Sequence, residues 1–341
     1  MDNVILVTGG AGFIGSNFIN MILAKDKNVE IINLDALTYA GNLENLRKIE
    51  EHLNYSFIHG NICDKDLVRT ICKENNVLGI IHFAAESHVD RSIIDAKPFI
   101  DTNVTGTLVL LEVALELGIN RFLQVSTDEV YGSLGETGKF METTPIAPNS
   151  PYSASKAAAD HLVMAFVNTY GLPALITRCS NNYGEFQFPE KLIPLMILNA
   201  IEDKKLPVYG DGMNVRDWIH VHDHCFGIWE VFEKGRVGEV YNLGGNCEMP
   251  NIQIVKTILR LLHKPESLIE YVKDRPGHDK RYAMDITKAK NELGWEPQIT
   301  FESGIEQTIR WYLDNPEWCK NVRSGVYRDY YQQQYGSRQN L

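Results

Sequence analysis

The sequence lacks the features that mark membrane, secreted or nucleic-acid-binding proteins. Its 341 residues contain no Cys-x-x-Cys pair, no internal repeat and no low-complexity tract. No apolar run reaches the about 18 uncharged residues that span a bilayer, and no basic, apolar leader opens the chain. Acidic residues outnumber basic ones by 44 to 33, and the net charge of -11 opposes nonspecific binding to nucleic acid or anionic membranes. We therefore expect a cytoplasmic protein with neither a membrane nor a nucleic-acid partner.

Disulfides and metal ligands are also not indicated. The six cysteines are scattered, which is typical of reduced thiols rather than of a disulfide frame or a zinc site. His220, His222 and His224 alternate and could share one face of a strand as metal ligands. Asp217 and Asp223 offer these histidines local hydrogen-bond partners, so we expect no metal site.

The first residues of the chain have the pattern of a dinucleotide-binding unit. The β-branched run Val4–Val7 leads into Gly9-x-x-Gly12-x-x-Gly15, after which a helix is expected. Such a turn lets the backbone approach a pyrophosphate and directs helix N-terminal amides at its charge. The second strand ends at Asp35, about 20 residues after Gly15, where a carboxylate accepts bonds from a ribose and repels a 2′-phosphate. The pattern favours NAD over NADP.

The alternation of strands and helices continues beyond Asp35 and predicts the fold class. Strands expected at 57–62, 79–85 and 121–125 are separated by helices at 64–75 and 105–117. This rhythm predicts a doubly wound, parallel α/β sheet of the Rossmann type. The rhythm ends after Arg178, and turn signals there predict a second, smaller α+β substrate lobe. We expect residues 1–184 with about 221–245 in the large lobe, and 185–220 with 246–341 in the small one.

The chemistry is expected between Ser126 and Lys156. Thr127, Asp128 and Glu129 follow a predicted buried strand, which is where open α/β sheets place reactive groups. Tyr152 and Lys156 would share one face of a helix, and the ammonium would lower the phenol pKa from about 10 toward neutrality. An ordinary amphipathic helix can carry the same pair, so the Tyr-Lys spacing alone is weak. Its combination with the carboxylates and the glycine turn indicates an acid/base site beside a redox cofactor.

These motifs identify a family. The segment 8–15 (Thr-Gly-Gly-Ala-Gly-Phe-Ile-Gly) together with Tyr152-x-x-x-Lys156 resembles the extended short-chain dehydrogenase/reductases, most of which act on nucleotide sugars. More narrowly, the segments 126–132, 84–92 and 216–218 look like those of the dTDP-glucose 4,6-dehydratases. The Asp128-Glu129 doublet is the sharpest element, because related epimerases and decarboxylases generally lack it.

The resemblance implies a lyase that keeps and recycles NAD. Tyr152, assisted by Lys156, would take the 4-hydroxyl proton while a hydride leaves C4. Thr127 would bind the 4-hydroxyl or the ketone, or cap the turn at the strand end, and the two roles are compatible. Glu129 would take the C5 proton, and a protonated Asp128 would donate to the departing C6 hydroxyl. Return of the hydride to C6 gives dTDP-4-keto-6-deoxyglucose plus water. An acid and a base must act together in this elimination, so we expect Asp128 to be the more desolvated carboxyl or to be influenced by the charge of Glu129.

The resemblance also implies ligand contacts. Around NAD these are Gly9, Gly12, Phe13, Ile14, Gly15, Asp35, Thr38, Asn61, Ile62, Ala84, Ala85, Thr102, Tyr152, Lys156 and Asn182. Around the sugar nucleotide they are Ser87, His88, Asn181, Lys191, Leu192, Tyr209, Arg216, Asn251, Arg275 and His278. The sequence departs from many relatives at Asn61, where Asp is common, and at Glu185, where Pro is common.

Competing functions remain at this point. A UDP-sugar dehydratase, epimerase or decarboxylase of the same family is the first alternative, because one Tyr at the nucleobase does not settle base specificity. A noncatalytic nucleotide-sugar or NAD-sensing scaffold is the second, although intact acid/base residues speak against it. The family further implies a homodimer, with the helices at 105–117 and 154–170 as the expected interface.

Overall fold

A seven-stranded parallel sheet forms the larger lobe. The computed structural model describes residues 3–274 and 278–323. The strand order is β10 (Val240–Leu243), β6 (Ala174–Cys179), β5 (Arg121–Thr127), β4 (Gly79–His82), β1 (Asn3–Thr8), β2 (Val29–Asp35) and β3 (Tyr55–His59). The inner strands β4, β5 and β6 are nearly continuously buried, as a parallel sheet covered on both faces requires, whereas the edge strand β3 is only partly buried. The predicted Rossmann-type sheet is confirmed.

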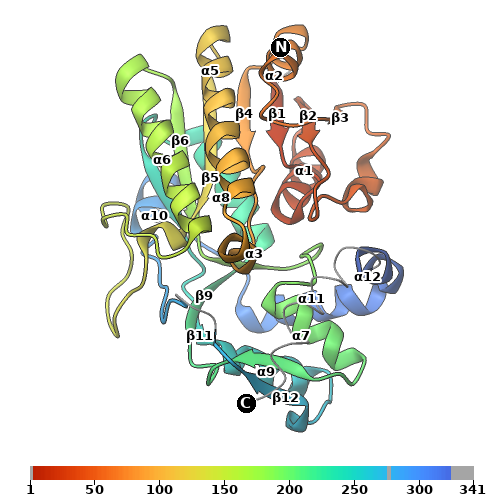
Figure 1. Ribbon diagram of the computed structural model, residues 1–341. Coiled ribbons are helices and arrows are strands. Elements are labelled where there is room, and N and C mark those ends of the chain that lie inside the picture. Colours follow the sequence, from red (N-terminus) through yellow and green to blue (C-terminus); the bar gives the residue numbers. More distant parts are fainter. Residues whose placement is uncertain (1–2, 275–277, 324–341) are drawn as a thin grey trace.

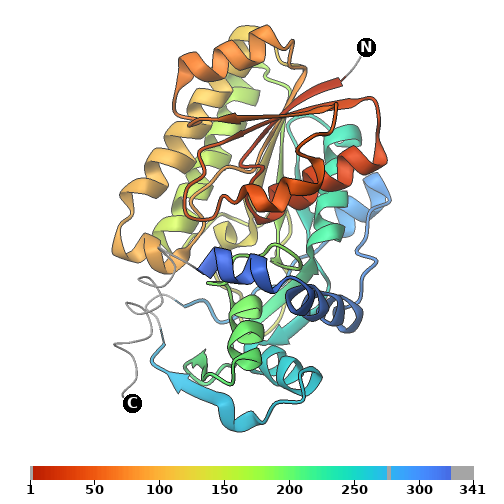
Figure 2. The same cartoon turned by 90° about the vertical axis from the view of Figure 1, so that its right-hand side faces the viewer.

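Helices cover both faces of this sheet (Figures 1 and 2). One layer contains α2 (Lys65–Glu74), α5 (Thr107–Leu117) and α6 (Pro151–Tyr170). The other layer contains α1 (Phe13–Lys25), α8 (Val221–Lys234) and α10 (Thr287–Leu293). A capping box between Ser150 and Ser153, with Pro151 in the first turn, starts α6 where the chain must turn toward the sheet. This start fixes the face on which Tyr152 and Lys156 point.

The larger lobe contains one long helical stretch. Lys97–Leu117 joins α4 (Lys97–Phe99), the π-helical segment η2 (Ile100–Gly106) and α5, and is long and apolar enough to cross a membrane by length and composition. The buried helices of a folded core pass the same test. Here α5 packs against α2 and α6 over the sheet.

The smaller lobe is built from short strands and helices. Its strands form two sheets, β8 (Leu206–Tyr209) with β12 (Ile269–Val272), and β7 (Asn181–Tyr183) with β9 (Val215–His220) and β11 (Glu248–Pro250). Its helices are α7 (Leu192–Ile201), α9 (Asn251–Leu261), α11 (Phe301–Asp314) and α12 (Pro316–Arg323), with the 3₁₀ turn η4 (Glu266–Leu268). Their apolar faces meet in one core around Ile197, Trp218 and Ile305.

The chain crosses between the lobes more than once. After β9 it returns to the sheet through α8 and β10, and after β12 it returns again through α10. Trp295, just beyond α10, packs closely against Gly227 of α8. We propose the interleaved division expected from the sequence, with α10 transferred to the larger lobe.

Candidate active site

The glycine turn between β1 and α1 brings backbone segments into direct contact. Gly9 has a φ of +72°, and a Cβ there would lie 2.5 Å from the backbone nitrogen of Ala84. A Cβ on Gly15 would lie 2.4 Å from the Gly9 carbonyl oxygen. Neither position tolerates a side chain, so the turn leaves the first amides of α1 exposed toward the cavity. The arrangement fits the pyrophosphate of a dinucleotide.

Asp35 closes the adenosine side of this turn. Its Oδ2 accepts from the Ala11 amide at 2.9 Å, and its Oδ1 accepts from the Leu37 amide at 2.8 Å. Burial raises the pKa of the carboxyl, and these two amides oppose that shift. Each carboxylate oxygen keeps a further lone pair, so Asp35 is able to accept from ribose hydroxyls as well. The residues present therefore fit NAD.

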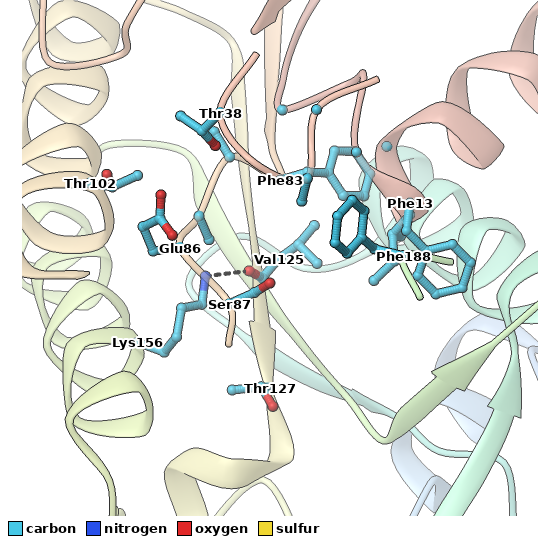
Figure 3. Close-up of a pocket in the computed structure, with 18 of the residues that line it drawn as sticks. Phe13, Thr38, Phe83, Glu86, Ser87, Thr102, Val125, Thr127, Lys156 and Phe188 are labelled. Carbon is cyan, nitrogen blue, oxygen red and sulfur yellow. Dashed lines mark hydrogen bonds between the residues drawn. The ribbon is translucent and has the colours of Figure 1, made fainter. Parts of the chain in front are cut away.

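A cavity of about 310 Å³ runs along the carboxyl ends of the sheet strands. It is lined by every residue predicted around NAD and by Thr127, Asp128 and Glu129. Phe13, Phe83 and Phe188 gather on one side, and Lys156 reaches in from the other (Figure 3). The same cavity therefore connects the glycine turn with the acid/base group.

Several lining residues were missed by the sequence analysis. They are Leu34, Ala36, Ala40, Gly41, Gly60, Phe83, Glu86, Val125, Ser126, Cys179, Ser180, Gln187, Phe188 and Glu190. Phe83, Ser126 and Ser180 directly follow or end sheet strands, so strand-end position was a usable signal. Gln187, Phe188 and Glu190 lie in a loop without periodicity and had no such signal.

The two adjacent carboxyls occupy different environments. Asp128 and Glu129 open the 3₁₀ turn η3 (Asp128–Tyr131) directly after β5, and the Thr127 hydroxyl accepts from the Glu129 amide at 3.3 Å. Asp128 is 2% exposed, whereas Glu129 is partly exposed to the cavity. Burial raises the pKa of Asp128 well above its usual value, and the charges of Glu129 and Asp217 add to the effect. The prediction that Asp128 is the more desolvated carboxyl is confirmed.

The Tyr-Lys pair corrects an expectation from the sequence. The Lys156 ammonium donates to the Val125 carbonyl oxygen at 2.8 Å (Figure 3). Burial and the charge of Glu129 raise the pKa of Tyr152 well above 10, while burial lowers the pKa of Lys156. The predicted fall of the phenol pKa toward neutrality is therefore absent in the protein alone, because desolvation exceeds any stabilisation of the phenolate by the ammonium.

The residues predicted around the sugar nucleotide divide into two groups. Ser87, Asn181 and Lys191 line the cavity, and the Lys191 ammonium donates to the Ser87 carbonyl oxygen at 2.9 Å. The residues His88, Leu192, Tyr209, Arg216, Asn251 and His278 do not line it. Arg275 lies outside the described residues.

The second group contacts other parts of the chain. The Tyr209 hydroxyl donates to Asp90 Oδ2 at 3.0 Å, and the Tyr209 ring meets that of His278 at 6.0 Å. Arg216 is buried, lies 4.4 Å over the ring of Tyr282 and donates to the Asp279 carbonyl oxygen at 2.9 Å. Leu192 begins α7, and Asn251 begins α9. His88 Nε2 lies 3.7 Å from Glu190 Oε2, beside the cavity wall.

A buried carboxyl lies at the edge of the cavity. Glu190 Oε2 is 3.2 Å from Arg91 Nη2, and the Arg91 guanidinium stacks 3.8 Å over the ring of Tyr39. Burial raises the pKa of Glu190 to about 7, although Lys191 and Arg91 oppose the shift. Through Arg91, Glu190 links the loop before α7 to Tyr39 in the loop after β2. No sequence motif predicted this contact.

The three alternating histidines do not share one strand face. β9 ends at His220, and His222 and His224 belong to the first turns of α8. His220 Nδ1 accepts from the His222 amide at 3.3 Å, and His224 Nδ1 bonds Asn182 Oδ1 at 2.8 Å. His224 thereby supports Asn182 in the cavity wall.

Comparison with known proteins gives the same assignment from sequence and from structure. A family model described as GDP-mannose 4,6 dehydratase matches residues 6–308. The dTDP-glucose 4,6-dehydratase of Xanthomonas campestris pv. campestris (strain B100) is 57% identical, over 95% of this chain and 97% of that protein. The chain belongs to the dTDP-glucose 4,6-dehydratase family.

Solved structures agree with this family assignment. The dTDP-glucose 4,6-dehydratase of Bacillus anthracis, in complex with NAD, matches with a TM-score of 0.89 and 55% identity, over 94% of this chain and 99% of that chain. The dTDP-glucose 4,6-dehydratase of Streptomyces venezuelae, with NAD and TYD bound, matches with a TM-score of 0.91 and 48% identity, over the same shares. The family resemblance drawn from the motifs is confirmed.

Two positions depart from the pattern expected for dTDP-glucose 4,6-dehydratases. Asn61 Oδ1 accepts from the Cys63 amide at 2.9 Å, which orients the side chain at the cavity wall and leaves one oxygen lone pair for an adenine amino group. The Glu185 carbonyl oxygen accepts from Asn17 at 3.0 Å, and its carboxylate lies 3.3 Å from His222. These contacts anchor the loop to α1 and α8 without a proline.

Proposed function

We propose that this chain removes water from dTDP-glucose with NAD as its resident cofactor and forms dTDP-4-keto-6-deoxyglucose. The observation that carries the proposal is the doublet of a buried Asp128 and a partly exposed Glu129 in the cavity that contains the glycine turn and Asp35. A simple dehydrogenase needs only one acid/base group at the oxidised carbon. An elimination needs a second proton donor and a second acceptor.

The roles of the residues follow from their environments. NAD, when bound, supplies the oxidant for C4 and, in its reduced form, the hydride that returns to C6. Tyr152 accepts the 4-hydroxyl proton, and Thr127 binds the same oxygen. The oxidised C4 acidifies the proton at C5, which Glu129 takes and gives back to C5 when the hydride adds to C6. Asp128, held protonated by burial and by neighbouring carboxylates, gives its proton to the departing C6 hydroxyl.

The cation needed by Tyr152 is supplied locally. Lys156 lies one helical turn away on α6, and its ammonium is held toward the base of the cavity by the Val125 carbonyl. The charge of an oxidised nicotinamide adds to that of Lys156 and opposes the burial that raises the pKa of Tyr152. We propose that the phenolate forms only when cofactor and sugar occupy the cavity.

The nucleotide end of the substrate is assigned to the smaller lobe. Arg216 offers a planar donor to a diphosphate, and Tyr209 offers a ring to a base. Arg275, which lies outside the described residues, is proposed as a second diphosphate contact. Asn251 Oδ1 is buried at the start of α9 and has no hydrogen-bond partner among the described residues. An amide oxygen in this state suits a donor on the substrate.

Incubation with dTDP-glucose and, separately, with UDP-glucose tests the function. The expected result is a 4-keto product from dTDP-glucose, detected by its absorbance in alkali, without added NAD. Preferential turnover of UDP-glucose would contradict the dTDP assignment, and an epimer would contradict the lyase. Denaturing the protein and assaying the supernatant for NAD is the control for retained cofactor.

We also propose a homodimer through α5 and α6 and a cytoplasmic location. Leu115 of α5 is 38% exposed and Tyr170 of α6 is 57% exposed, so both helices present apolar surface outside the core. The six cysteines are all free thiols, which fits a reducing compartment.

A further inference from the structure

The helices α11 and α12 of the smaller lobe lie at its boundary with the larger lobe (Figures 1 and 2). Trp318 of α12 packs edge-on against Trp311 and Phe186, with ring centroids 4.9 and 6.2 Å apart. Its indole Nε1 donates to Asn45 Oδ1 at 2.8 Å, in the 3₁₀ helix η1 (Leu43–Ile49) of the other lobe. This hydrogen bond joins the end of the described chain to the cofactor half.

Further hydrogen bonds connect Asn45 to the dinucleotide-binding turn. Its Nδ2 donates to the Ala11 carbonyl oxygen at 3.0 Å, and the Ala11 amide donates to Asp35 Oδ2 at 2.9 Å. Trp318 is 7% exposed and Asn45 is 3% exposed, so water competes poorly for these bonds. A continuous buried chain therefore runs from α12 to the carboxylate assigned to the adenosine ribose.

The neighbouring helix makes the equivalent contact at the opposite end of the cavity. The Tyr312 hydroxyl of α11 donates to the Gln187 carbonyl oxygen at 2.6 Å. Gln187 Nε2 donates to the Asn182 carbonyl oxygen at 2.9 Å, and both Gln187 and Asn182 line the cavity. The helix pair thus contacts one cavity wall through Trp318 and another through Tyr312.

We propose that α11 and α12 form a clasp that holds the NAD site closed between turnovers, with Trp318 and Tyr312 as positioning residues. The inference rests on the proposed function, in which the hydride taken from C4 returns to C6 and the cofactor never needs to leave. Separation of the helix pair from Asn45 and Gln187 frees the glycine turn and the loop around Asn182 together. Release of NAD then requires both contacts to open, which makes exchange slow.

The test measures exchange of bound labelled NAD for excess unlabelled NAD in the intact protein. Trp318→Phe keeps an aromatic side chain but removes the indole donor, and Tyr312→Phe keeps the phenyl ring and removes the hydroxyl donor in α11. Each is expected to speed NAD exchange about 3- to 10-fold, the effect of one buried hydrogen bond. Trp311→Phe is the matched control, because it alters the same aromatic cluster and leaves the Trp318 and Tyr312 bonds in place.

A double-mutant comparison separates a clasp from general loosening. Asn45→Ala removes the link between Trp318 and Ala11, so Trp318→Phe added to Asn45→Ala should give little further acceleration. At saturating NAD, kcat for dTDP-glucose should stay within about 2-fold of the parent, since no reacting group changes. Exchange of Trp318→Phe and Tyr312→Phe at the rate of the parent or of Trp311→Phe would overturn the clasp. Absence of dTDP-glucose turnover by the parent would instead refute the function, because NAD exchange is measured without substrate.

Discussion

Asp128 and Glu129 are neighbours in the chain, yet the fold places them in environments that favour opposite protonation states. The backbone turns into η3 directly after β5, which buries one carboxyl beneath the strand ends and leaves the other toward the cavity. Desolvation and the adjacent charge both favour the neutral form of Asp128. The pair can therefore hold a proton donor and a proton acceptor at one pH.

Replacing Asp128 by Asn should remove the proton donor without changing the shape of the side chain. We expect kcat for dTDP-glucose to fall about 10²- to 10⁴-fold, the usual contribution of a general acid. The pKa of Asp128 is raised, and activity should be lost at high pH when this carboxyl loses its proton. The alkaline limb of the pH profile should therefore change in the variant. An unchanged profile of kcat against pH would contradict the assignment of Asp128 as the acid.

Glu190 should make stability depend on pH. Burial raises its pKa from 4.5 to about 7, so the folded chain binds this proton more tightly than the unfolded chain. Its stabilising contribution is complete below pH 4.5 and is lost as pH rises through 7, a change of about 3 kcal/mol in the free energy of unfolding. Denaturant titrations from pH 4.5 to 8 should show a smaller decline in Glu190→Gln. Glu185→Gln, a partly exposed carboxylate of the same loop, should keep the decline of the parent.

Residue-scale features were predictable where a local motif carried them. The burial of Asp128 followed from its place at the end of a strand. The pKa of Tyr152 was predicted in the wrong direction, because four-residue spacing does not reveal that Lys156 bonds the Val125 carbonyl of another element. Glu190 and Tyr39 come together only through packing of two loops, which no sequence pattern encodes.

The glycine turn is the element on which cofactor binding depends most. In Gly15→Ala the new methyl would meet the Gly9 carbonyl at 2.4 Å and the Gly10 Cα at 2.8 Å, which are backbone atoms that cannot rotate away. We expect loss of about 1 to 3 kcal/mol in the free energy of unfolding and at least about 10-fold weaker NAD binding. Gly135→Ala is the control, since its methyl has open space and no positive φ. Equal NAD affinity in the two variants, measured by calorimetry, would contradict the close-approach argument.

The start of α6 offers a second test at this scale. Ser150 accepts from the Ser153 amide at 3.1 Å, and Ser150→Ala removes that cap. A loss of about 1 kcal/mol in the free energy of unfolding is expected. Because Tyr152 lies in the capped turn, kcat should also fall, whereas Ser56→Ala, at an exposed position of β3, should change neither quantity. Denaturant titration measures the free energy of unfolding, and the dTDP-glucose assay measures kcat.

Elements were predicted well where strands and helices alternate regularly. From β1 to β6 each buried strand is followed by a helix with an apolar face, and these local periods indicate the parallel sheet. The three-stranded sheet was not predicted, since β7, β9 and β11 are short and pair across long stretches of chain. The proposed transfer of α10 to the larger lobe rests on a similar long-range contact, because Trp295 packs against Gly227 far back in the sequence.

At the scale of the whole molecule, the proposed homodimer makes a direct prediction. The double variant Leu115→Glu, Tyr170→Glu places charges on the exposed apolar positions of α5 and α6 and should convert the dimer into monomers. Sedimentation velocity should report about half the mass of the parent. Leu53→Glu, at a fully exposed site away from these helices, is the control. Dimers in the double variant would exclude this interface.

The order of the strands in the sheet also has a consequence for synthesis of the chain. β6 is flanked on its outer side by β10, which pairs with it from Val240↔Ile176 to Leu243↔Cys179. Until the ribosome has released that segment, β6 presents an unpaired row of amides and carbonyls to other nascent chains. Truncated products that end between these two strands should therefore coaggregate during translation, whereas products that extend past the returning strand should remain dispersed.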